Sequence, residues 1–269
     1  MDMQSIELTK NDYPILFQDK NLGKQNHYSH VVTMNPVKVL MDAGWMPREV
    51  ITLKPRKEKL KGFQRHRVRF FNPNLPQVNG SYVEILLTNA YDARSSFILQ
   101  LGVFRLICAN GMVVGDTFNR ESVRHVGYAD QKIYDAIQKL LPQTETILSA
   151  VDRYSSTILE ENEQKIFGRS ILEMRFGEED KSWIVDDQSI HNLYQTRRIE
   201  DNKKDLWTTF NRAQENLCRF GFYASKKAED GVVEKKKVQA IKNAFRADPL
   251  NKALWTLSER MYELKRATA

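Results

Sequence analysis

The sequence predicts an α+β fold in which a mostly antiparallel sheet is flanked by helices and followed by a helical C-terminal half. Between Ser81 and Phe118, apolar residues alternate with other residues and then form a continuous apolar run, which is typical of paired strands. Asn110-Gly111 lies between two apolar segments and predicts a tight hairpin turn, because both central residues of that turn need a positive φ. After residue 129, apolar residues recur at helical spacing.

The composition is that of a folded protein with a full hydrophobic core. The 269 residues are 41% apolar, which suits one large domain or two smaller ones. The net charge of +7 favours an anionic partner without identifying it. Two cysteines, Cys108 and Cys218, indicate neither a disulfide framework nor a cysteine zinc site. Because the N-terminus lacks a secretion signal and no stretch has the length of a membrane span, we expect a cytoplasmic protein without membrane contact.

We expect three parts along the chain. Residues 1–29 are polar with scattered aromatics and predict an N-terminal arm. Residues 30–128 predict the sheet-containing α+β core, which starts with a short helix that Asn35-Pro36 begins and Gly44 ends. Residues 129–269 predict a helical part packed on this core, with helix starts at Asp130, Thr144, Ser189, Asp205 and Asp248-Pro249.

One of these helices suggests self-association. The helix from Thr144 to Gln164 carries a narrow apolar stripe, which either packs on the sheet or forms an oligomer seam; its members are Ile147, Val151, Tyr154 and Ile158. Weak contacts along a nucleic-acid strand become useful when several protomers act together. We therefore expect a homo-oligomer.

A basic hairpin precedes the central strands. Between Arg48 and Arg69, nine Lys and Arg residues oppose two Glu residues, and the resulting +7 equals the net charge of the chain. Strands at about 50–56 and 65–71, joined by a loop at 57–62, would carry basic side chains at every second position beside Phe residues. This arrangement suits a phosphate backbone with bases stacked on aromatic rings. The alternative is a solvated edge hairpin whose charges block edge pairing.

The candidate nucleic-acid-binding residues come from this hairpin and from a second basic segment, 226–246, which has a net charge of +4. In the hairpin they are Lys54, Arg56, Lys57, Lys59, Lys61, Phe63, Arg65, Arg67 and Arg69. Lys235, Lys236 and Lys237 form the secondary contact, and we place Lys226 and Lys227 in a loop.

No catalytic constellation, metal site or cofactor motif is recognisable, so we expect no enzyme of a familiar class. Glycine-rich phosphate loops, nucleophile elbows and zinc-protease motifs are missing from the sequence. His27 and His30 are close in sequence, but no third or fourth metal ligand lies nearby. The polar run Gln214-Glu215-Asn216 lies beside an apolar stripe and predicts internal hydrogen bonds that fix helix docking.

Four segments resemble the phage/plasmid-like protein family, which is defined by a domain of unknown function numbered nine-three-two. They are GFQRHRVRF at 62–70, GVFRLICANGMVVG at 102–115, DLWTTFNRAQENLCRFGF at 205–222 and LNKALWTLSE at 250–259. The resemblance runs in order over residues 30 to 260. It implies an association with mobile elements, which often carry recombination and single-strand DNA functions in a bacterial host cell.

The leading hypothesis is a non-enzymatic nucleic-acid-binding protein of phage or plasmid DNA metabolism, with single-stranded DNA as ligand and annealing as its activity. The annealing part rests on analogy, because a basic β-hairpin beside a helix is not a motif match. The alternative is a protein-interaction module that inhibits or redirects a host defence or replication protein. A third hypothesis is a nuclease or nucleotide-modifying enzyme whose carboxylates the sequence does not single out.

Overall fold

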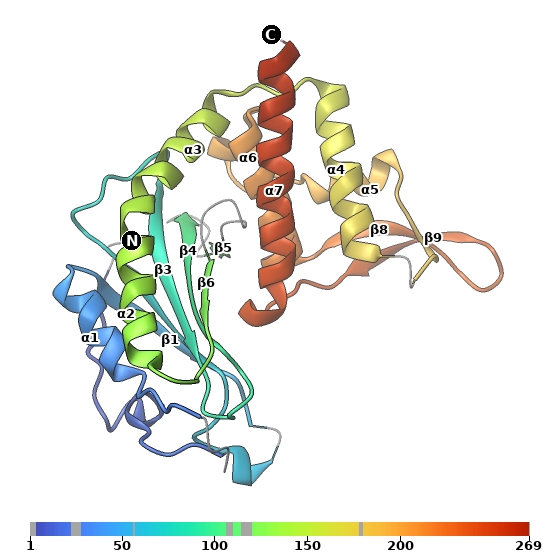
Figure 1. Cartoon of the computed structure of the whole chain (residues 1–269). Coiled ribbons are helices and arrows are strands. Elements are labelled where there is room, and N and C mark those ends of the chain that lie inside the picture. Colours follow the sequence, from blue (N-terminus) through green and yellow to red (C-terminus); the bar gives the residue numbers. More distant parts are fainter. Residues whose placement is uncertain are drawn as a thin grey trace. The chain divides into compact units, whose positions relative to one another are not determined.

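The computed structural model describes residues 4–22, 28–55, 57–105, 110–113, 120–177 and 180–268, and it has an α+β fold as predicted (Figure 1). The chain divides into two compact units. The first unit comprises Met1–Phe104 and Phe118–Leu148, and the second comprises Arg105–Thr117 and Ser149–Ala269. The boundary between them therefore falls inside a helix, α3, which spans Thr144–Ser156.

The first unit is built on an antiparallel sheet with the strand order β1-β2-β3-β4, and β6 pairs with the first half of β4. Val68, Phe70, Ile85 and Leu87 share one face of this sheet and are fully buried. Helix α2 packs against β6 and α1 (Figure 1). The elements of the unit are α1 (Met34–Asp42), β1 (Met46–Thr52), β2 (His66–Phe71), β3 (Ser81–Asn89), β4 (Phe97–Arg105), β6 (Arg120–Val123) and α2 (Ala129–Leu140).

The basic hairpin forms, but its first strand is earlier than predicted. Strand β1 spans Met46–Thr52 instead of 50–56, and the last backbone bond to its partner runs from Leu53 N to Arg65 O, at 3.0 Å. Pro55 has no N–H group to continue the ladder, so the chain leaves the sheet before it. Lys54 therefore lies in the connecting loop and not on a strand.

The predicted turn at Asn110-Gly111 is wrong, because both residues belong to strand β5 (Asn110–Val113). The chain leaves β4 at Arg105, and the connection falls at residues 106–109, outside the described ranges. Cys108 and the predicted return strand beyond Val113 also lie outside the described ranges.

The second unit is mostly helical, but it also contains a sheet that the sequence prediction missed. Strands β7 (Trp183–Ile184), β8 (Phe222–Lys227) and β9 (Val233–Val238) pair in the order β7-β8-β9, antiparallel throughout. Asp230-Gly231 lies in the β8–β9 connection, where Gly231 has a φ of +84°. This dipeptide is a hairpin signal, and the lysine-rich flanks concealed it.

Several helices of the second unit begin at other residues than predicted. The predicted helix 144–164 is two helices, because residues 157–159 pair with the chain around Asp205 and interrupt it. Glu160 then caps the second helix through a capping box with Glu163. The helix predicted at Ser189 is capped by Asp186, and the one predicted at Asp248-Pro249 begins at Ala244. The bounds are α3 (Thr144–Ser156), α4 (Glu161–Phe176), α5 (Asp187–Leu193), α6 (Leu206–Glu215) and α7 (Ala244–Thr268).

The core of the second unit is aromatic. Trp207 stacks on Phe210 at a centroid distance of 5.4 Å, and Trp255 contacts both rings edge-on. Tyr154, from the predicted oligomer stripe, packs on Trp255 at 5.4 Å. Within the described ranges, no helix combines the length and the apolar character that a membrane span needs.

Candidate nucleic-acid interface

Two arginines of the predicted interface are buried inside the first unit. Arg67 is 3% exposed and Arg69 is 7% exposed. Arg69 forms ion pairs with Glu84 and Glu49, both at 2.7 Å, while Arg48 contacts the other oxygen of Glu84 at 2.9 Å. The Arg67 Nε donates to Thr88 Oγ1 at 3.0 Å. These guanidinium groups hold neighbouring strands together, so we assign Arg67 and Arg69 a structural role.

The four charged side chains of this group can be buried together because their charges cancel. Two guanidinium groups, of Arg48 and Arg69, face two carboxylates, of Glu49 and Glu84. The nearby carboxylates keep the pKa of Arg69 above its usual value although burial opposes the charge. A charge buried without such partners would be expensive. The +7 of the segment therefore overstates the positive charge that this hairpin presents to solvent.

The exposed part of the predicted interface is the connecting loop. Its four lysines, which we call the lysine loop, all face solvent: Lys54, Lys57, Lys59 and Lys61. Glu58 is the acidic residue of this loop, and it pairs with Lys61 at 3.3 Å. Phe63 and Arg65 are half-buried, and the Phe63 carbonyl accepts a hydrogen bond from Tyr91 N. Arg56 lies outside the described residues.

The second predicted patch is a strand hairpin, which we call the lysine hairpin: Lys226 and Lys227 on β8, and Lys235, Lys236 and Lys237 on β9. Lys226 and Lys227 therefore lie in a strand and not in a loop. Cross-strand pairs share a face of a sheet. Tyr223 lies opposite Lys237 on one face, whereas Lys226 lies beside Trp183 on the other. Both faces of the hairpin thus combine lysines with an aromatic ring.

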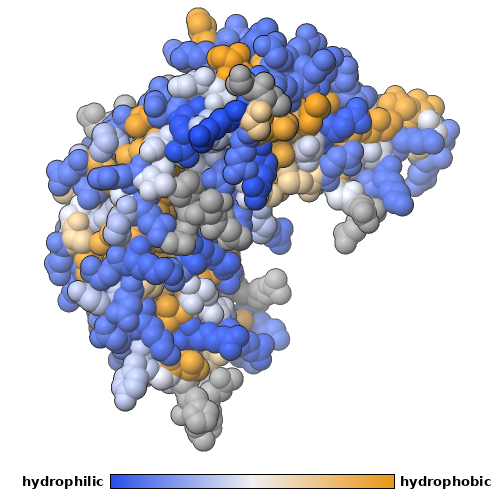
Figure 2. Space-filling model, turned by 45° about the horizontal axis from the view of Figure 1, so that its top comes forward, coloured by the Kyte–Doolittle hydropathy of each residue, from blue (hydrophilic) through white to orange (hydrophobic). Residues whose placement is uncertain are grey.

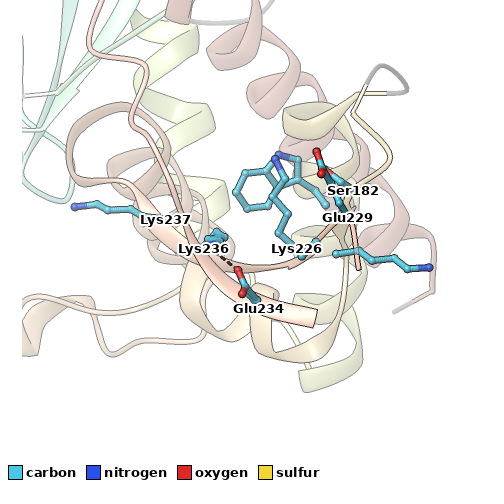
Figure 3. Close-up of a pocket in the computed structure, with 9 residues that line it drawn as sticks. Ser182, Lys226, Glu229, Glu234, Lys236 and Lys237 are labelled. Atoms are coloured by element: carbon cyan, nitrogen blue, oxygen red, sulfur yellow. Dashed lines mark ion pairs between the residues drawn. The ribbon is translucent and has the colours of Figure 1, made fainter. Parts of the chain in front are cut away.

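An open groove of about 650 Å³ runs along this hairpin (Figure 3). The ring of Trp183 stacks on Phe176 at a centroid distance of 5.0 Å, and the Lys226 ammonium lies 4.8 Å from the Trp183 centroid. Lys236 pairs with Glu234 at 2.6 Å, as the dashed line in Figure 3 marks. The lining residues are Ser182, Trp183, Lys226, Lys227, Ala228, Glu229, Glu234, Lys236 and Lys237.

The opposite face of the hairpin has a matching pair. Tyr223 is 47% exposed, and the Lys235 ammonium lies 5.3 Å from its ring centroid. Among the described residues, no carboxylate lies within ion-pair distance of Lys227, Lys235 or Lys237. These three ammonium groups are available to an anionic ligand. Figure 2 shows hydrophilic residues over most of the visible face, with hydrophobic residues in separate groups.

A buried histidine network in the first unit was not expected from the sequence. Thr33 Oγ1 lies 2.8 Å from His66 Nε2 and 2.6 Å from the Tyr91 hydroxyl, and it accepts a hydrogen bond from Asn89 Nδ2 at 2.9 Å. The Asn89 Oδ1 lies 3.0 Å from His125 Nε2. Burial lowers the pKa of His66 to about 4 and also lowers the pKa of His125.

This network resembles a nucleophile–base arrangement, but Thr33 and His66 are fully buried. Its role is therefore to fix the start of α1 against the ends of β2 and β3. His30 bonds through Nε2 to Gln18 O at 2.9 Å, and His27 lies outside the described residues. Over the described part of the chain, no three His, Cys, Asp or Glu side chains are grouped closely enough to hold a metal ion.

The predicted amide network on α6 is confirmed. Gln214 Nε2 donates to Asn251 Oδ1 on α7 at 3.3 Å, and Asn216 Nδ2 donates to the carbonyl of Leu193 at 2.8 Å. Glu215 pairs with Arg198. The three side chains connect the end of α6 and the turn after it to α7, to the last residue of α5 and to the segment after α5, which is the docking function expected of them.

Comparisons with known proteins identify the family. The model of a family described as "Domain of unknown function (DUF932)" matches residues 27–255. UPF0380 protein YfjQ of Escherichia coli (strain K12) is 28% identical over 248 residues, which cover 92% of this chain and 87% of the relative. UPF0380 protein YafZ of the same organism is 27% identical over the same shares of the two chains. No solved structure gives a significant match.

Proposed function

The chain belongs to the DUF932 family, and we propose that it binds nucleic acid, with single-stranded DNA as its preferred ligand. The observation that carries this proposal is the groove of the lysine hairpin, in which Trp183 shares a face of the sheet with Lys226 and Lys236, and whose lining also includes Lys227 and Lys237. Grooves that bind single strands combine positive charge along the backbone with aromatic rings on which bases stack. Trp183 and Tyr223 supply one ring for each face of the hairpin.

The chemistry of the exposed cations favours contact with the backbone over recognition of sequence. A lysine ammonium is a compact point charge, and it neutralises phosphate without the planar fork that reads base edges. Each neutralised phosphate releases counterions, so binding should be steeply salt-dependent. The lysine loop of the first unit supplies a second set of such charges.

We further propose that this binding serves DNA metabolism of phage and plasmid elements in the bacterial cytoplasm, including recombination by strand annealing. Annealing requires a strand to be held along its backbone, and a groove rich in lysine suits that requirement. Self-association would multiply weak contacts along the strand. Sedimentation with and without an oligonucleotide tests self-association, and a clean monomer in both conditions would exclude self-association.

A mobility-shift titration at two salt concentrations tests the proposal. The parent should bind a single-stranded oligonucleotide at about 50 mM salt and weaken steeply by about 200 mM. Changing Lys235, Lys236 and Lys237 to Gln should weaken binding to every sequence and reduce the log–log salt slope by about 2 for single strands. The matched control changes three other exposed lysines to Gln: Lys10, Lys203 and Lys204.

Trp183 provides a second readout. It is half-buried, whereas Trp45, Trp207 and Trp255 are buried, so an oligonucleotide that stacks in the groove should quench the fluorescence of Trp183 selectively. Trp183→Phe should remove that quenching. If the parent binds no nucleic acid at about 50 mM salt, where phosphate-driven binding is strong, the proposal fails. The same lysines would then be assigned to an acidic protein surface, as in the host-protein alternative.

A further inference from the structure

A second cavity in the second unit shares no lining residue with the groove of the lysine hairpin. It has a volume of about 380 Å³, within the range of about 300–1,000 Å³ of small-molecule pockets. The Tyr194 hydroxyl donates to the Gln164 carbonyl at 3.0 Å and thereby ties the segment after α5 to α4. The polar lining residues important here are Gln164, Tyr194, Gln195, Thr196, Asn202 and Arg212.

Arg212 is the unusual member of this lining. It is half-buried, and its guanidinium makes one long hydrogen bond, from Nη2 to Thr209 Oγ1 at 3.4 Å, and lies 5.5 Å from the Tyr194 ring centroid. Its Nε is buried, with no hydrogen-bond acceptor among the described residues. No described carboxylate lies within ion-pair distance of it. A guanidinium has five N–H donors and a fixed positive charge, so most of the hydrogen-bonding capacity of Arg212 is unused.

Arg198, in the same unit, is also partly buried, but its guanidinium has carboxylate partners. It pairs with Asp201 at 2.8 Å and with both oxygens of Glu215. Asp201 and Asp205 act on Arg212 only at longer range, and burial lowers the pKa of Arg212. The cost of burying a charge is normally offset by a counter-charge. None of the described carboxylates lies close enough to Arg212 to supply one.

Three other charged residues of the cavity form an ion-pair group of their own. Lys165 lies between Glu161, at 3.3 Å, and Asp187, at 3.2 Å. This group of three carries a net charge of −1, but neither carboxylate lies within ion-pair distance of Arg212, and the ammonium of Lys165 is engaged by both of them. Among the described lining residues, Arg212 carries a positive charge that no carboxylate meets at ion-pair distance.

We propose that this cavity binds a small molecule through an oxyanion group, a phosphate or a carboxylate, held by the terminal amino groups of Arg212. Arg donors match either oxyanion in a planar, bidentate geometry. The amides of Gln195 and Asn202 and the hydroxyl of Thr196 supply further polar groups for the remainder of the ligand. This inference is independent of nucleic-acid binding, because it depends on different residues.

Thermal denaturation of the full chain tests the proposal with inorganic phosphate and acetate as probes, each against sodium chloride at the same ionic strength. A ligand that binds the folded state raises the melting temperature in a saturable manner. At millimolar concentrations, at least one of the two anions should do so for the parent. A response to phosphate alone would identify a phosphate ligand, and a response to acetate alone a carboxylate ligand.

Two variants and a control assign the effect to Arg212. Arg212→Gln should lose the anion-dependent rise, and Arg212→Lys, which keeps the charge but not the planar fork, should need a higher anion concentration for the same rise. Arg169→Gln, an exposed arginine on α4, should respond like the parent. A parent that responds to neither anion beyond chloride, or an unchanged rise in both Arg212 variants, would overturn the proposal.

Discussion

Protonation of His66 should make the first unit unstable to acid. The ring is fully buried, with Nε2 at 2.8 Å from Thr33 Oγ1 and Nδ1 at 3.0 Å from the Gln64 carbonyl. Burial disfavours the charged form and lowers the pKa of His66 from 6.5 to about 4. The folded state therefore holds the ring neutral at pH values where the unfolded chain binds a proton.

The sign and the size of the effect follow from this difference. A base whose folded-state pKa is lowered contributes stability that is present above the unfolded pKa of 6.5, and this stability is lost as the pH falls towards 4. One pKa unit corresponds to about 1.4 kcal/mol, so His66 accounts for about 3 kcal/mol in total and about 2 kcal/mol between pH 7 and pH 5. His125 adds a loss of the same sign, because burial lowers its pKa too.

Chemical denaturation of the parent and of His66→Gln at pH 7 and pH 5 measures this contribution. The variant should be less stable at pH 7, because Thr33 loses one of its three hydrogen-bond partners, but its loss between the two pH values should be about 2 kcal/mol smaller than that of the parent. Amide hydrogen exchange in β2 and β3 places the effect in the first unit. His191→Gln, at an exposed position on α5, is the control. An equal loss in His66→Gln and in the parent would refute the reasoning.

Three further predictions concern side chains that are buried or half-buried. Arg69→Gln should lower the free energy of unfolding by about 3 kcal/mol, because Glu84 is 1% exposed and loses one of its two cations; denaturant titration measures this, and an unchanged midpoint would contradict it. Trp255→Ala should lower it by about 3–5 kcal/mol, and a variant that melts with the parent would remove Trp255 from the core. Burial raises the pKa of Cys218 to about 12, so the thiol should react slowly with alkylating reagents at neutral pH, and Cys218→Ala should bind the same ligands as the parent; rapid labelling would show the reverse.

Periodicity was sufficient to predict the elements that depend on local sequence. Strand β3 forms in the predicted strand region, although its residues are buried on both faces, and α6 begins after Asp205, whose side chain accepts a hydrogen bond from Thr208 N at 2.7 Å. The predictions failed where contacts with residues far away in the sequence determine where an element ends. The helix predicted to continue from Thr144 to Gln164 ends at Ser156, because Thr157 and Leu159 bond to backbone around Asp205, about fifty residues later. No local pattern contains that information.

In the candidate site, too, features that depend on local sequence were predicted and features that depend on distant contacts were not. The sequence identified Lys235, Lys236 and Lys237 correctly as an exposed basic group, because consecutive lysines are rarely buried. It could not show that Arg69 is neutralised, because Glu84 lies on the next strand and its register depends on how β2 and β3 pair. Trp183 was missed as a partner of the lysines for a similar reason, since about forty residues separate it from Lys226.

Arginines and lysines lie in different places in this protein, so the net charge of a segment does not give the charge that it presents to a ligand. Arg48, Arg69 and Arg198 are partly or fully buried, and each meets carboxylates in a geometry that uses the planar guanidinium. The lysines of the loop and the hairpin lie at the surface, where a hydrated ammonium is favourable and where an anionic strand can reach it. These basic residues therefore fall into two populations: partly or fully buried arginines that pair with carboxylates, and surface lysines of the loop and the hairpin. Arg212 belongs to neither population, because it is partly buried like the arginines of the first but has no described carboxylate within ion-pair distance. That combination is expected of a residue whose counter-charge is supplied by a bound molecule.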